Sequence, residues 1–370
     1  MVSNRSLVLL QEPTGMPQVG KDIDYRTSDI DIESAPSNGL ILKTVAIAID
    51  PTLRNTMRLS NPKPYAPLYK KGEAMWGYGL SEVVVSGNAG WKKGDILMTP
   101  LTKMSTYWRL EEGELNGPSK AGYKKIDPLP DLNVTTYLGA LGMPGMTAYM
   151  SIKDIIGDFK PNSKLFVTSG AGFVGSLVCQ IAKQAGVKVI ASAGSEDKVA
   201  FLREKLGVDK AFNYKTADID AELASFGGEE GIDYLYDNVG GKQLNSFLAH
   251  SAVHGVVVVC GAISAYNASK DQPAEVISNF PMAVLGRQLT VRGFIVASLY
   301  PRWEDSFWKE MPKMVQDGKL KSQEDVRVGM DALAGSFEDL LTGKHQGKLI
   351  VLVDEEQKGR WIQRNPDGFA

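Results

Sequence analysis

The chain has few residues that could cross-link it or bind a metal: of its 370 residues, two are cysteines and three are histidines. Cys179 and Cys260 both lie in apolar stretches, so we expect no disulfide framework and a reducing compartment. The sequence also lacks an N-terminal apolar core followed by a small-residue cleavage site, and it has no run of about 20 apolar residues. These absences predict a cytoplasmic protein that does not bind a membrane.

Neither basic nor acidic residues are in large excess. The sequence has 41 Lys and Arg against 43 Asp and Glu, a formal net charge of -2, and no dense basic run. Binding to nucleic acid or to an anionic membrane depends on a basic surface. We therefore expect neither partner, and we favour a small-molecule substrate.

The length and the pattern of apolar residues predict more than one domain. In residues 1–145, short apolar stretches alternate with Gly- and Pro-rich turns, which predicts a strand-rich domain. We expect its strands to include residues 40–49, 80–85 and 95–98.

In residues 146–312, strand patterns alternate with helix patterns, which predicts an α/β fold with a doubly wound parallel sheet. The expected strands are 165–168, 187–191, 232–237 and 256–260, and the expected helices are 172–184 and 196–206. Residues 313–370 carry a further helix pattern and the apolar stretch 348–353. We expect that stretch to return to the first domain as a strand, followed by a loosely held tail after Asp354.

The most informative motif is a set of glycines, Gly170, Gly172 and Gly175, between the first of these strands and its helix. With the next strand they complete a unit of about 30 residues that is typical of dinucleotide binding. The glycines let the backbone approach a pyrophosphate, and the helix amino terminus supplies N–H groups and a favourable dipole. The alternative is a tight strand-to-helix turn in an unrelated α/β domain.

The end of the second strand indicates which cofactor is bound. NAD-specific sites place a carboxylate there, about 20 residues past the glycines, whereas residues 191–195 (ASAGS) contain none. Lys198 could bind the additional ribose phosphate of NADP(H), and Tyr214 could donate a hydroxyl to it. The alternative is that Lys198 is a solvated lysine, and Glu196 and Asp197 lie close to it in sequence.

Further motifs occur together along the chain. They are Asp50-Pro51 followed by Arg54, Gly77-Tyr78-Gly79, residues 142–149 (GMPGMTAY), 213–216 (NYKT), 237–241 (DNVGG), 260–267 (CGAISAYN) and Arg292-Gly293-Phe294. With these motifs the chain resembles the zinc-independent medium-chain dehydrogenase/reductases, specifically the prostaglandin reductases and plant alkenal double-bond reductases, over residues 50–353. The resemblance implies a Rossmann-type domain, a GroES-like substrate domain and a homodimer.

The resemblance also implies roles for residues of the cofactor site. Those assigned to the pyrophosphate are Gly172, Phe173, Val174 and Gly175; those at the 2′-phosphate are Lys198 and Tyr214; Asn238 is assigned to the sugar or phosphate region, and Gly194 is a further cofactor-binding residue. The nicotinamide side would be lined by Cys260, Gly261, Ala262, Ile263, Ser264 and Tyr266, with Phe294, Ile295 and Val296.

Two positions depart from the family pattern. The family usually has Tyr after Asp-Pro, where this chain has Thr52, so an aromatic wall or a hydroxyl at the substrate end is missing or replaced. The family pattern Gly-x-Asn-x-Gly-Lys reads here Gly343-Lys344-His345-Gln346-Gly347-Lys348. His345 therefore stands where the family has an amide that contacts the cofactor.

We expect no metal. A catalytic zinc site generally takes three protein ligands. His250 and His254 have helix spacing but lack the intervening Glu of a metalloprotease motif, and a helix end near the surface is the alternative. We expect Cys179 to pack in the first helix of the nucleotide fold and Cys260 to form a wall of the cofactor site.

The family mechanism predicts an NADPH-dependent ene-reductase acting on α,β-unsaturated ketones or aldehydes. Hydride goes to the β-carbon, negative charge moves to the carbonyl oxygen as an enolate, and the α-carbon is then protonated. Tyr266 is the candidate hydroxyl at that oxygen, with Tyr78 as a second one; for both, a packed aromatic is the alternative.

Other functions remain compatible with the sequence. A quinone reductase or a secondary alcohol dehydrogenase fits the same scaffold, and so does a catalytically weak NADPH-binding regulatory protein. An apolar substrate channel could be formed by Met75, Trp76, Met143, Met146 and Tyr149, although a core role is equally compatible with the methionines.

Overall fold

The computed structural model describes residues 1–115, 122–129, 132–269, 273–278 and 280–354. The chain forms two compact units, one of Met1–Gly139 with Glu324–Ala370 and one of Ala140–Gln323. The sequence placed the corresponding boundaries at residues 145 and 312. The helix 143–151 packs on other helices of the second unit, and this explains why the division falls before it. The tail expected after Asp354 lies outside the described residues.

The second unit is a parallel α/β sheet. Its strands are β8 (Lys164–Val167), β9 (Lys188–Ala193), β10 (Lys210–Asn213), β11 (Ile232–Asp237), β12 (Ser251–Val259) and β13 (Thr290–Gly293). All neighbouring pairs are parallel, in the order β10-β9-β8-β11-β12-β13. The chain moves outward from β8 to β10 and then resumes on the other side of β8 with β11. This reversal between β8 and β11 is the switch point at which such sheets bind ligands.

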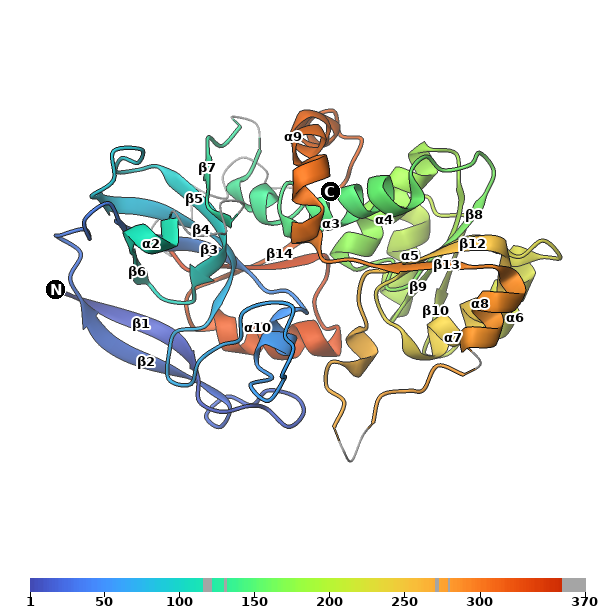
Figure 1. The fold of residues 1–370 in the computed structure, drawn as a ribbon, viewed down its shortest axis with the longest axis horizontal. Coiled ribbons are helices and arrows are strands. Elements are labelled where there is room, and N and C mark those ends of the chain that lie inside the picture. The colour runs from blue at the N-terminus through green and yellow to red at the C-terminus, as the bar shows by residue number, and fades with distance from the viewer. Residues whose placement is uncertain (116–121, 130–131, 270–272, 279, 355–370) are drawn as a thin grey trace. The chain divides into compact units, whose positions relative to one another are not determined.

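Helices cover both faces of this sheet. They are α3 (Met143–Ser151), α4 (Phe173–Gln184), α5 (Glu196–Ala200), α6 (Ile219–Gly227), α7 (Gly241–His250), α8 (Phe280–Arg287) and α9 (Tyr300–Gln316). Figure 1 shows α3 and α4 on one side of the sheet and α6, α7 and α8 on the other. Apolar side chains of α6, α7 and α8 pack with Phe166, Ile190 and Leu235 of the strands in one core. The predicted alternation of strands and helices is confirmed.

Two predictions in this unit need correction. The expected helix 196–206 is α5 followed by a π-helical turn, Phe201–Lys205. The strand expected from residue 256 begins at Ser251, so His250 ends α7 whereas His254 lies in β12 with φ 64°. The two histidines therefore do not share a helix face, and the ring of His250 instead lies 3.2 Å from Asp220.

The first unit is strand-rich. Its strands are β1 (Val2–Leu9), β2 (Ile23–Ile30), β3 (Leu40–Ala48), β4 (Trp76–Ser86), β5 (Ile96–Lys103), β6 (Tyr107–Leu110), β7 (Lys124–Ile126), β14 (Glu324–Val328) and β15 (Lys348–Leu352). Its helices are α1 (Leu53–Thr56), α2 (Glu112–Leu115) and α10 (Ala332–Thr342). The sheet order is β14-β15-β3-β4-β5-β7, with β6 also on β3. β15 pairs antiparallel with β3, which confirms the predicted return of residues 348–353.

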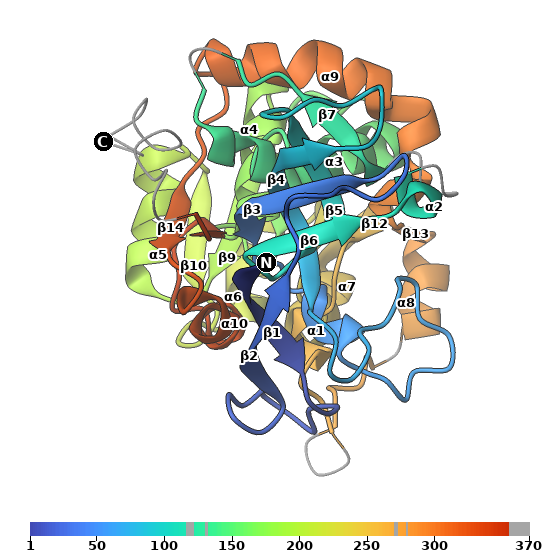
Figure 2. The ribbon, with the colours of Figure 1, turned by 90° about the vertical axis from the view of Figure 1, so that its left-hand side faces the viewer.

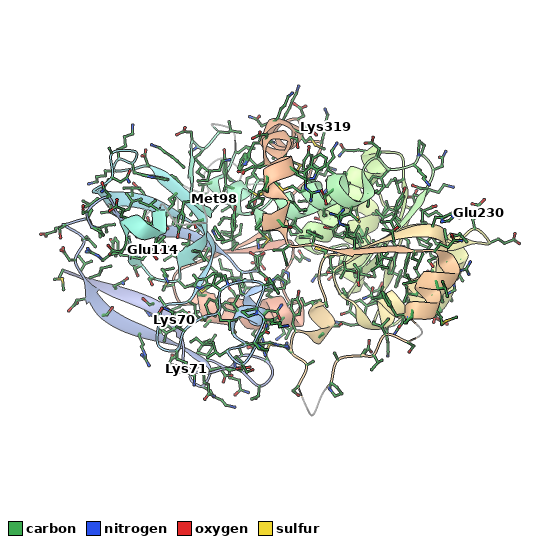
Figure 3. The ribbon with its side chains drawn as sticks, viewed as in Figure 1. Lys70, Lys71, Met98, Glu114, Glu230 and Lys319 are labelled. Carbon is green, nitrogen blue, oxygen red and sulfur yellow. The ribbon has the colours of Figure 1, made fainter. Side chains whose placement is uncertain are left out.

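This unit has its own hydrophobic core. The antiparallel ribbon β1–β2 packs beside α1 and α10, as Figure 2 shows, and Leu7, Ile23, Leu53 and Phe337 meet there. Among the residues labelled in Figure 3, Met98 of β5 is 2% exposed, whereas Lys70, Lys71 and Glu114 are exposed.

The described residues contain no group of three or more His, Cys, Asp or Glu that could hold a metal ion. Among the helices of the described ranges, none has the length and apolar character needed to cross a bilayer.

Candidate functional site

The glycine-rich turn after β8 is held by backbone hydrogen bonds to the neighbouring strand. Ser169 adopts a positive φ of 51°, and the Gly170 N–H donates to the Ser192 carbonyl at 2.8 Å. The Gly172 N–H closes the turn on the Ser169 carbonyl at 2.9 Å. The chain thus passes from β8 to the first residue of α4 in a fixed, tight loop.

Side chains would not fit at two glycines of this turn. A Cβ at Gly175 would collide with the Ser169 carbonyl oxygen, and one at Gly170 would lie 2.6 Å from the Cβ of Ala191. Close packing of helix on strand therefore requires both glycines. The tight strand-to-helix turn that the sequence predicted therefore accounts for the spacing of the glycines.

The amino terminus of α4 suits an anion. Its N-cap is Gly172, which offers no side-chain cap, and its first turn has no acidic residue. The N–H groups of Phe173, Val174 and Gly175 belong to the first turn, where helix N–H groups lack intrahelical acceptors. The Ser176 hydroxyl donates to the Phe173 carbonyl at 2.8 Å and so does not cap them. A phosphate at this helix end would receive both hydrogen bonds and a favourable dipole.

A basic corner lies at the ends of β9 and β10. Gly194 follows β9, and a Cβ there would lie 3.3 Å from the Tyr214 ring, 3.4 Å from its hydroxyl and 3.5 Å from Cε of Lys215. The Tyr214 N–H donates to the Ala193 carbonyl at 3.0 Å, which keeps the two strand ends together. Gly194 therefore opens a space beside the phenol and the lysine stem.

The charge of Lys198 interacts with that of Lys215 at the same corner. Burial lowers the pKa of Lys198, and the positive charge of Lys215 lowers it further. The Lys215 ammonium lies 6.0 Å from the centre of the Tyr214 ring. Two lysines that repel one another beside a phenol are the arrangement that a phosphate dianion would stabilise. Sequence reasoning missed Lys215, although it stands directly after Tyr214.

The acidic neighbour Glu196 is engaged elsewhere. Its carboxylate accepts a hydrogen bond from the Asn213 side-chain amide at 2.9 Å. The N-cap hydroxyl of Ser195 accepts from the Lys198 backbone N–H at 3.5 Å, so α5 begins immediately at the corner. Proximity in sequence therefore does not make Glu196 the carboxylate of an NAD-type ribose site.

The end of β11 is organised by a buried carboxylate. Asp237 accepts hydrogen bonds from the Thr168 hydroxyl at 2.8 Å and from the Val239 and Gly240 N–H groups, both at 3.0 Å. Burial raises the pKa of Asp237 despite these donors. Asn238 is fixed by the same threonine, since its side-chain amide donates to the Thr168 carbonyl at 2.8 Å. The loop thus positions Asn238 beside the glycine-rich turn.

The loop after β12 lies against this one. The N–H groups of Cys260 and Gly261 both donate to the Asp237 carbonyl, at 2.8 and 3.0 Å, and the Ser264 hydroxyl donates to the Val239 carbonyl at 2.6 Å. Burial raises the pKa of the Cys260 thiol to about 12. The thiol therefore stays protonated at neutral pH, as suits a wall of the site better than a nucleophile.

Tyr266 lies over the backbone of this loop. Its hydroxyl is 3.4 Å from the position that a Cβ of Gly261 would take, and its N–H donates to the Ile263 carbonyl at 3.2 Å. The short helix Ile263–Ala265, which includes Ser264, follows Ala262 and makes this turn. Because Gly261 has no side chain, the phenol can approach the carboxyl end of β12.

The predicted cofactor residues of the second unit thus follow the carboxyl ends of parallel strands. Phe294, Ile295 and Val296 follow β13 in the same way, and Ile295 is 44% exposed. In contrast, Tyr78, Thr52 and His345 belong to the first unit. Tyr78 is buried in β4, at an irregularity of the β4–β5 register between Gly77 and Gly79.

Two motifs of the first unit are joined by a buried ion pair. The Lys348 ammonium donates to the Asp50 carboxylate at 2.5 Å and to the Ile49 carbonyl at 3.3 Å. Arg54, also buried, donates to the carbonyls of Pro13 and Gly15 at 3.2 and 2.8 Å. Asp50, Arg54 and Lys348 therefore fix the chain around α1.

His345 contacts the end of a helix. Its Nδ1 lies 3.2 Å from the Asp339 carbonyl in the last turns of α10, after Gly343 has ended that helix with a left-handed φ of 74°. A ring N–H in this position satisfies a helix carbonyl. The contact explains how a ring is accommodated where the family has an amide.

Three residues of the proposed apolar channel belong to the core. Met75, Met146 and Tyr149 are 0%, 3% and 4% exposed. Trp76 is half-buried and packs edge-on against Tyr69, with ring centres 5.0 Å apart, and Met143 is also half-buried. Cys179 is buried in α4, as predicted.

Comparison with known proteins agrees with this geometry. A family model described as zinc-binding dehydrogenase matches residues 174–316, and one described as the N-terminal domain of oxidoreductase matches residues 5–116. The NADP(+)-dependent 2-alkenal reductase of Nicotiana tabacum is 33% identical, covering 96% of this chain and 99% of its own. Prostaglandin reductase 1 of Mus musculus is 34% identical, covering 95% and 99%.

Among solved structures, CurA from Vibrio vulnificus in complex with NADPH superposes with a TM-score of 0.84 at 30% identity, covering 95% of this chain and 99% of CurA. With such identities over nearly its whole length, the chain belongs to the medium-chain dehydrogenase/reductase superfamily, in the group of the prostaglandin reductases and plant alkenal double-bond reductases.

Proposed function

We propose that the protein is an NADPH-dependent ene-reductase that reduces the C=C bond of α,β-unsaturated ketones or aldehydes. Its relatives are NADP-dependent oxidoreductases, and the chain is an NADP-dependent oxidoreductase with them. The names 2-alkenal reductase and prostaglandin reductase support the narrower assignment to conjugated double bonds.

The observation that supports NADPH over NADH is the basic corner, where Lys198 and Lys215 lie beside Gly194 and Tyr214. The repulsion between the two ammonium groups is an electrostatic cost that a bound 2′-phosphate would offset. The glycine turn and the amino terminus of α4 would hold the pyrophosphate, where a Cβ at Gly175 has no room. The residues present therefore fit the cofactor at both of its phosphate positions.

The proposed reaction requires hydrogen-bond donors at the substrate carbonyl oxygen in addition to the cofactor. Bound NADPH would supply the hydride for the β-carbon of the substrate. We propose that the Tyr266 hydroxyl donates to the substrate carbonyl oxygen, where negative charge develops; Tyr78 of the first unit stays the second candidate hydroxyl. Cys260, with its raised pKa, would remain a neutral thiol beside an electrophilic substrate.

Two further features belong to the proposal. The outer edge of β13 has exposed Thr290, Arg292 and Gly293, and Met282 and Leu285 of α8 are 66% and 70% exposed. An open strand edge beside apolar surface supports a homodimer. The two cysteines are free thiols, which supports a cytoplasmic location.

The cofactor assignment is tested by replacing each lysine of the corner. Lys198→Ala and Lys215→Ala should each raise KM for NADPH by about 10-fold or more while changing KM for NADH little, since a charge-assisted hydrogen bond to phosphate is lost. Lys205→Ala, an exposed lysine of the next turn, is the matched control. Equal losses with both cofactors would remove the lysines from phosphate binding.

The reaction is tested by product analysis with one NADPH assay on an enone, a quinone and a saturated ketone. The proposal requires that the enone lose its double bond and keep its carbonyl. Preferential reduction of the quinone or of the saturated ketone would instead assign one of the alternative activities. Tight NADPH binding without turnover of any conjugated carbonyl would favour a regulatory protein.

A further inference from the structure

Asp154 is a buried carboxylate of the second unit to which the proposed reaction gives no role. It lies in the π-helical turn Ile152–Ile156 that follows α3, where the Gly157 N–H donates to the Ile152 carbonyl at 2.9 Å. The side chain of Asp154 is 2% exposed. A carboxylate is unfavourable in the interior unless cations or hydrogen-bond donors surround it, so its partners indicate what it holds.

The first partner is Arg292, the third residue of β13. One guanidinium nitrogen of Arg292 lies 2.6 Å from Oδ2 of Asp154, and the other donates to the main-chain carbonyl of Asp154 at 3.0 Å. The planar guanidinium thus binds the side chain and the backbone of one residue. This contact fixes the end of β13 to the turn after α3.

Two further partners come from the first turn of α9. A guanidinium nitrogen of Arg302 lies 2.6 Å from Oδ1 of Asp154, and the Trp303 indole N–H donates to the same oxygen at 2.9 Å. Contacts between a carboxylate and a guanidinium are stronger than those between neutral groups. The start of α9 is therefore fixed to the same carboxylate as the end of β13.

These contacts bracket the β13–α9 loop, residues 293–299. Residues 293–298 are exposed or half-buried, and Leu299, 1% exposed, is the first buried residue after β13. Within the loop, the Ser298 hydroxyl donates to the Ile295 carbonyl at 2.7 Å. Segments that bury few apolar side chains open easily. The position of this loop therefore depends on how its two ends are held.

The place of Asp154 in the sheet differs from that of another ion-paired carboxylate of this unit. Asp209 binds the Lys183 ammonium at 2.8 Å and accepts from the Val189 N–H at 2.7 Å, but it lies before β10, at the amino end of the sheet. The loop that Asp154 brackets leaves the carboxyl end of β13, and parallel sheets bind ligands at that end.

We propose that Asp154 is a positioning residue, whose carboxylate holds both ends of the β13–α9 loop and so places Phe294, Ile295 and Val296 at the nicotinamide side of the cofactor. This inference rests on the proposed function, because it takes the cofactor from it. Asp154 acts through the loop and not by contact with the reacting atoms.

Backbone hydrogen exchange without cofactor tests the anchor. Asp154→Asn keeps the shape of the side chain and removes the charge that both arginines bind. We therefore expect exchange at the Ser298 and Leu299 N–H groups, which donate to the Ile295 and Val296 carbonyls, to become about 10-fold faster or more. Unchanged exchange at these two groups would overturn the inference.

Cofactor binding and turnover in the same variant separate positioning from a merely structural role. The phosphate contacts lie elsewhere, so Asp154→Asn should change the Kd for NADPH by less than about 3-fold, whereas kcat with an enone should fall by about 10-fold. Asp209→Asn is the matched control, since it loses the ion pair with Lys183 and should keep both values. A loss mainly of NADPH affinity, or an equal loss of kcat in the two variants, would contradict a positioning role.

Two surface variants keep the test decisive if Asp154→Asn does not fold. Arg292→Gln and Arg302→Gln each release one end of the loop, and these side chains are 43% and 54% exposed. Each should speed exchange at Ser298 and Leu299 and lower kcat by about 3-fold; no change in either variant would overturn the inference. Lack of enone turnover by the wild-type protein would instead overturn the proposed function, whereas hydrogen exchange would still decide whether Asp154 anchors the loop.

Discussion

At the scale of single residues, space around the backbone decides which glycines are required. A Cβ at Gly145, in the first turn of α3, would collide with the carbonyl of Ala140. The clash involves backbone on both sides, so it cannot be relieved by rotating a side chain. We expect Gly145→Ala to lower the free energy of unfolding by about 2–4 kcal/mol, measured by urea denaturation.

The control for this prediction is another helical glycine of the same unit. A Cβ at Gly286 of α8 meets nothing within 4 Å. Gly286→Ala should be neutral or stabilising by about 0.5–1 kcal/mol, because alanine loses less backbone entropy in a helix. If the two substitutions changed stability equally, the steric argument for Gly145 would be wrong.

Residue chemistry was predictable where a motif fixes the backbone, and less so where partners meet through folding. The role of Gly170 and Gly175 follows from the strand–turn–helix pattern alone. The approach of Lys215 to Gly194 depends on how β9 and β10 pair, which no local pattern encodes. The contact of Tyr65 with Thr52 depends on the course of an irregular loop, so the sequence could show only that the family tyrosine was replaced.

At the scale of elements, β14 and β15 place a second carboxylate close to the buried Lys348. Glu324 stands opposite Lys348 in the parallel register of these strands. Burial raises the pKa of Glu324 to about 6, although the Thr135 hydroxyl and the charge of Lys348 lower it. The ordinary value for this side chain is 4.5. The folded chain therefore binds a proton here more tightly than the unfolded chain does.

This difference makes stability depend on pH. The contribution of Glu324 is fully favourable below pH 4.5 and is lost as pH rises through 6, because the charged carboxylate is then the buried form. Glu324→Gln removes the charge, so the variant should gain stability relative to the wild type between these pH values, by at most about 2 kcal/mol. Urea unfolding at a series of pH values measures this difference.

An exposed glutamate of the same unit provides the control. Glu33→Gln should change the free energy of unfolding little, since that side chain lies at the surface. A Glu324→Gln variant whose stability relative to the wild type did not change with pH would refute the assigned titration.

The sequence predicted the type of each helix or strand better than the residues at which it begins and ends. β11 has the predicted bounds, and β15 ends one residue before the predicted strand does. β12 begins five residues before the apolar stretch that marked it, because Ser251 already pairs with Ile232 of β11, and the register of the two strands shifts between Ile232 and Tyr234. The π-helical turn at 201–205 keeps the helix-like apolar pattern, so the sequence could not distinguish it from a longer helix.

At the scale of the whole molecule, the two units have separate hydrophobic cores and different secondary structure: one is strand-rich and the other is a parallel α/β sheet. Alternating strands and helices predicted the parallel sheet of the second unit, and the apolar stretch at 348–353 predicted the return to the first. The buried Asp50–Lys348 pair was not predictable, because its partners lie 298 positions apart. Patterns in a sequence report local periodicity, whereas such long-range pairs depend on the completed fold.

The division into units makes a prediction for cofactor binding. NADPH should slow backbone hydrogen exchange in the loops that follow β8, β9, β11 and β12, because a ligand that binds only the folded state stabilises it by about 2.7 kcal/mol at 100 times its Kd. Exchange in the separate cluster of Leu40, Val83, Leu97 and Trp108 of the first unit should stay unchanged. NADH at the same concentration should protect the loop after β9 less, because it lacks the phosphate that the Lys198 and Lys215 corner would bind. Equal protection of that loop by both cofactors would contradict this account of cofactor selection.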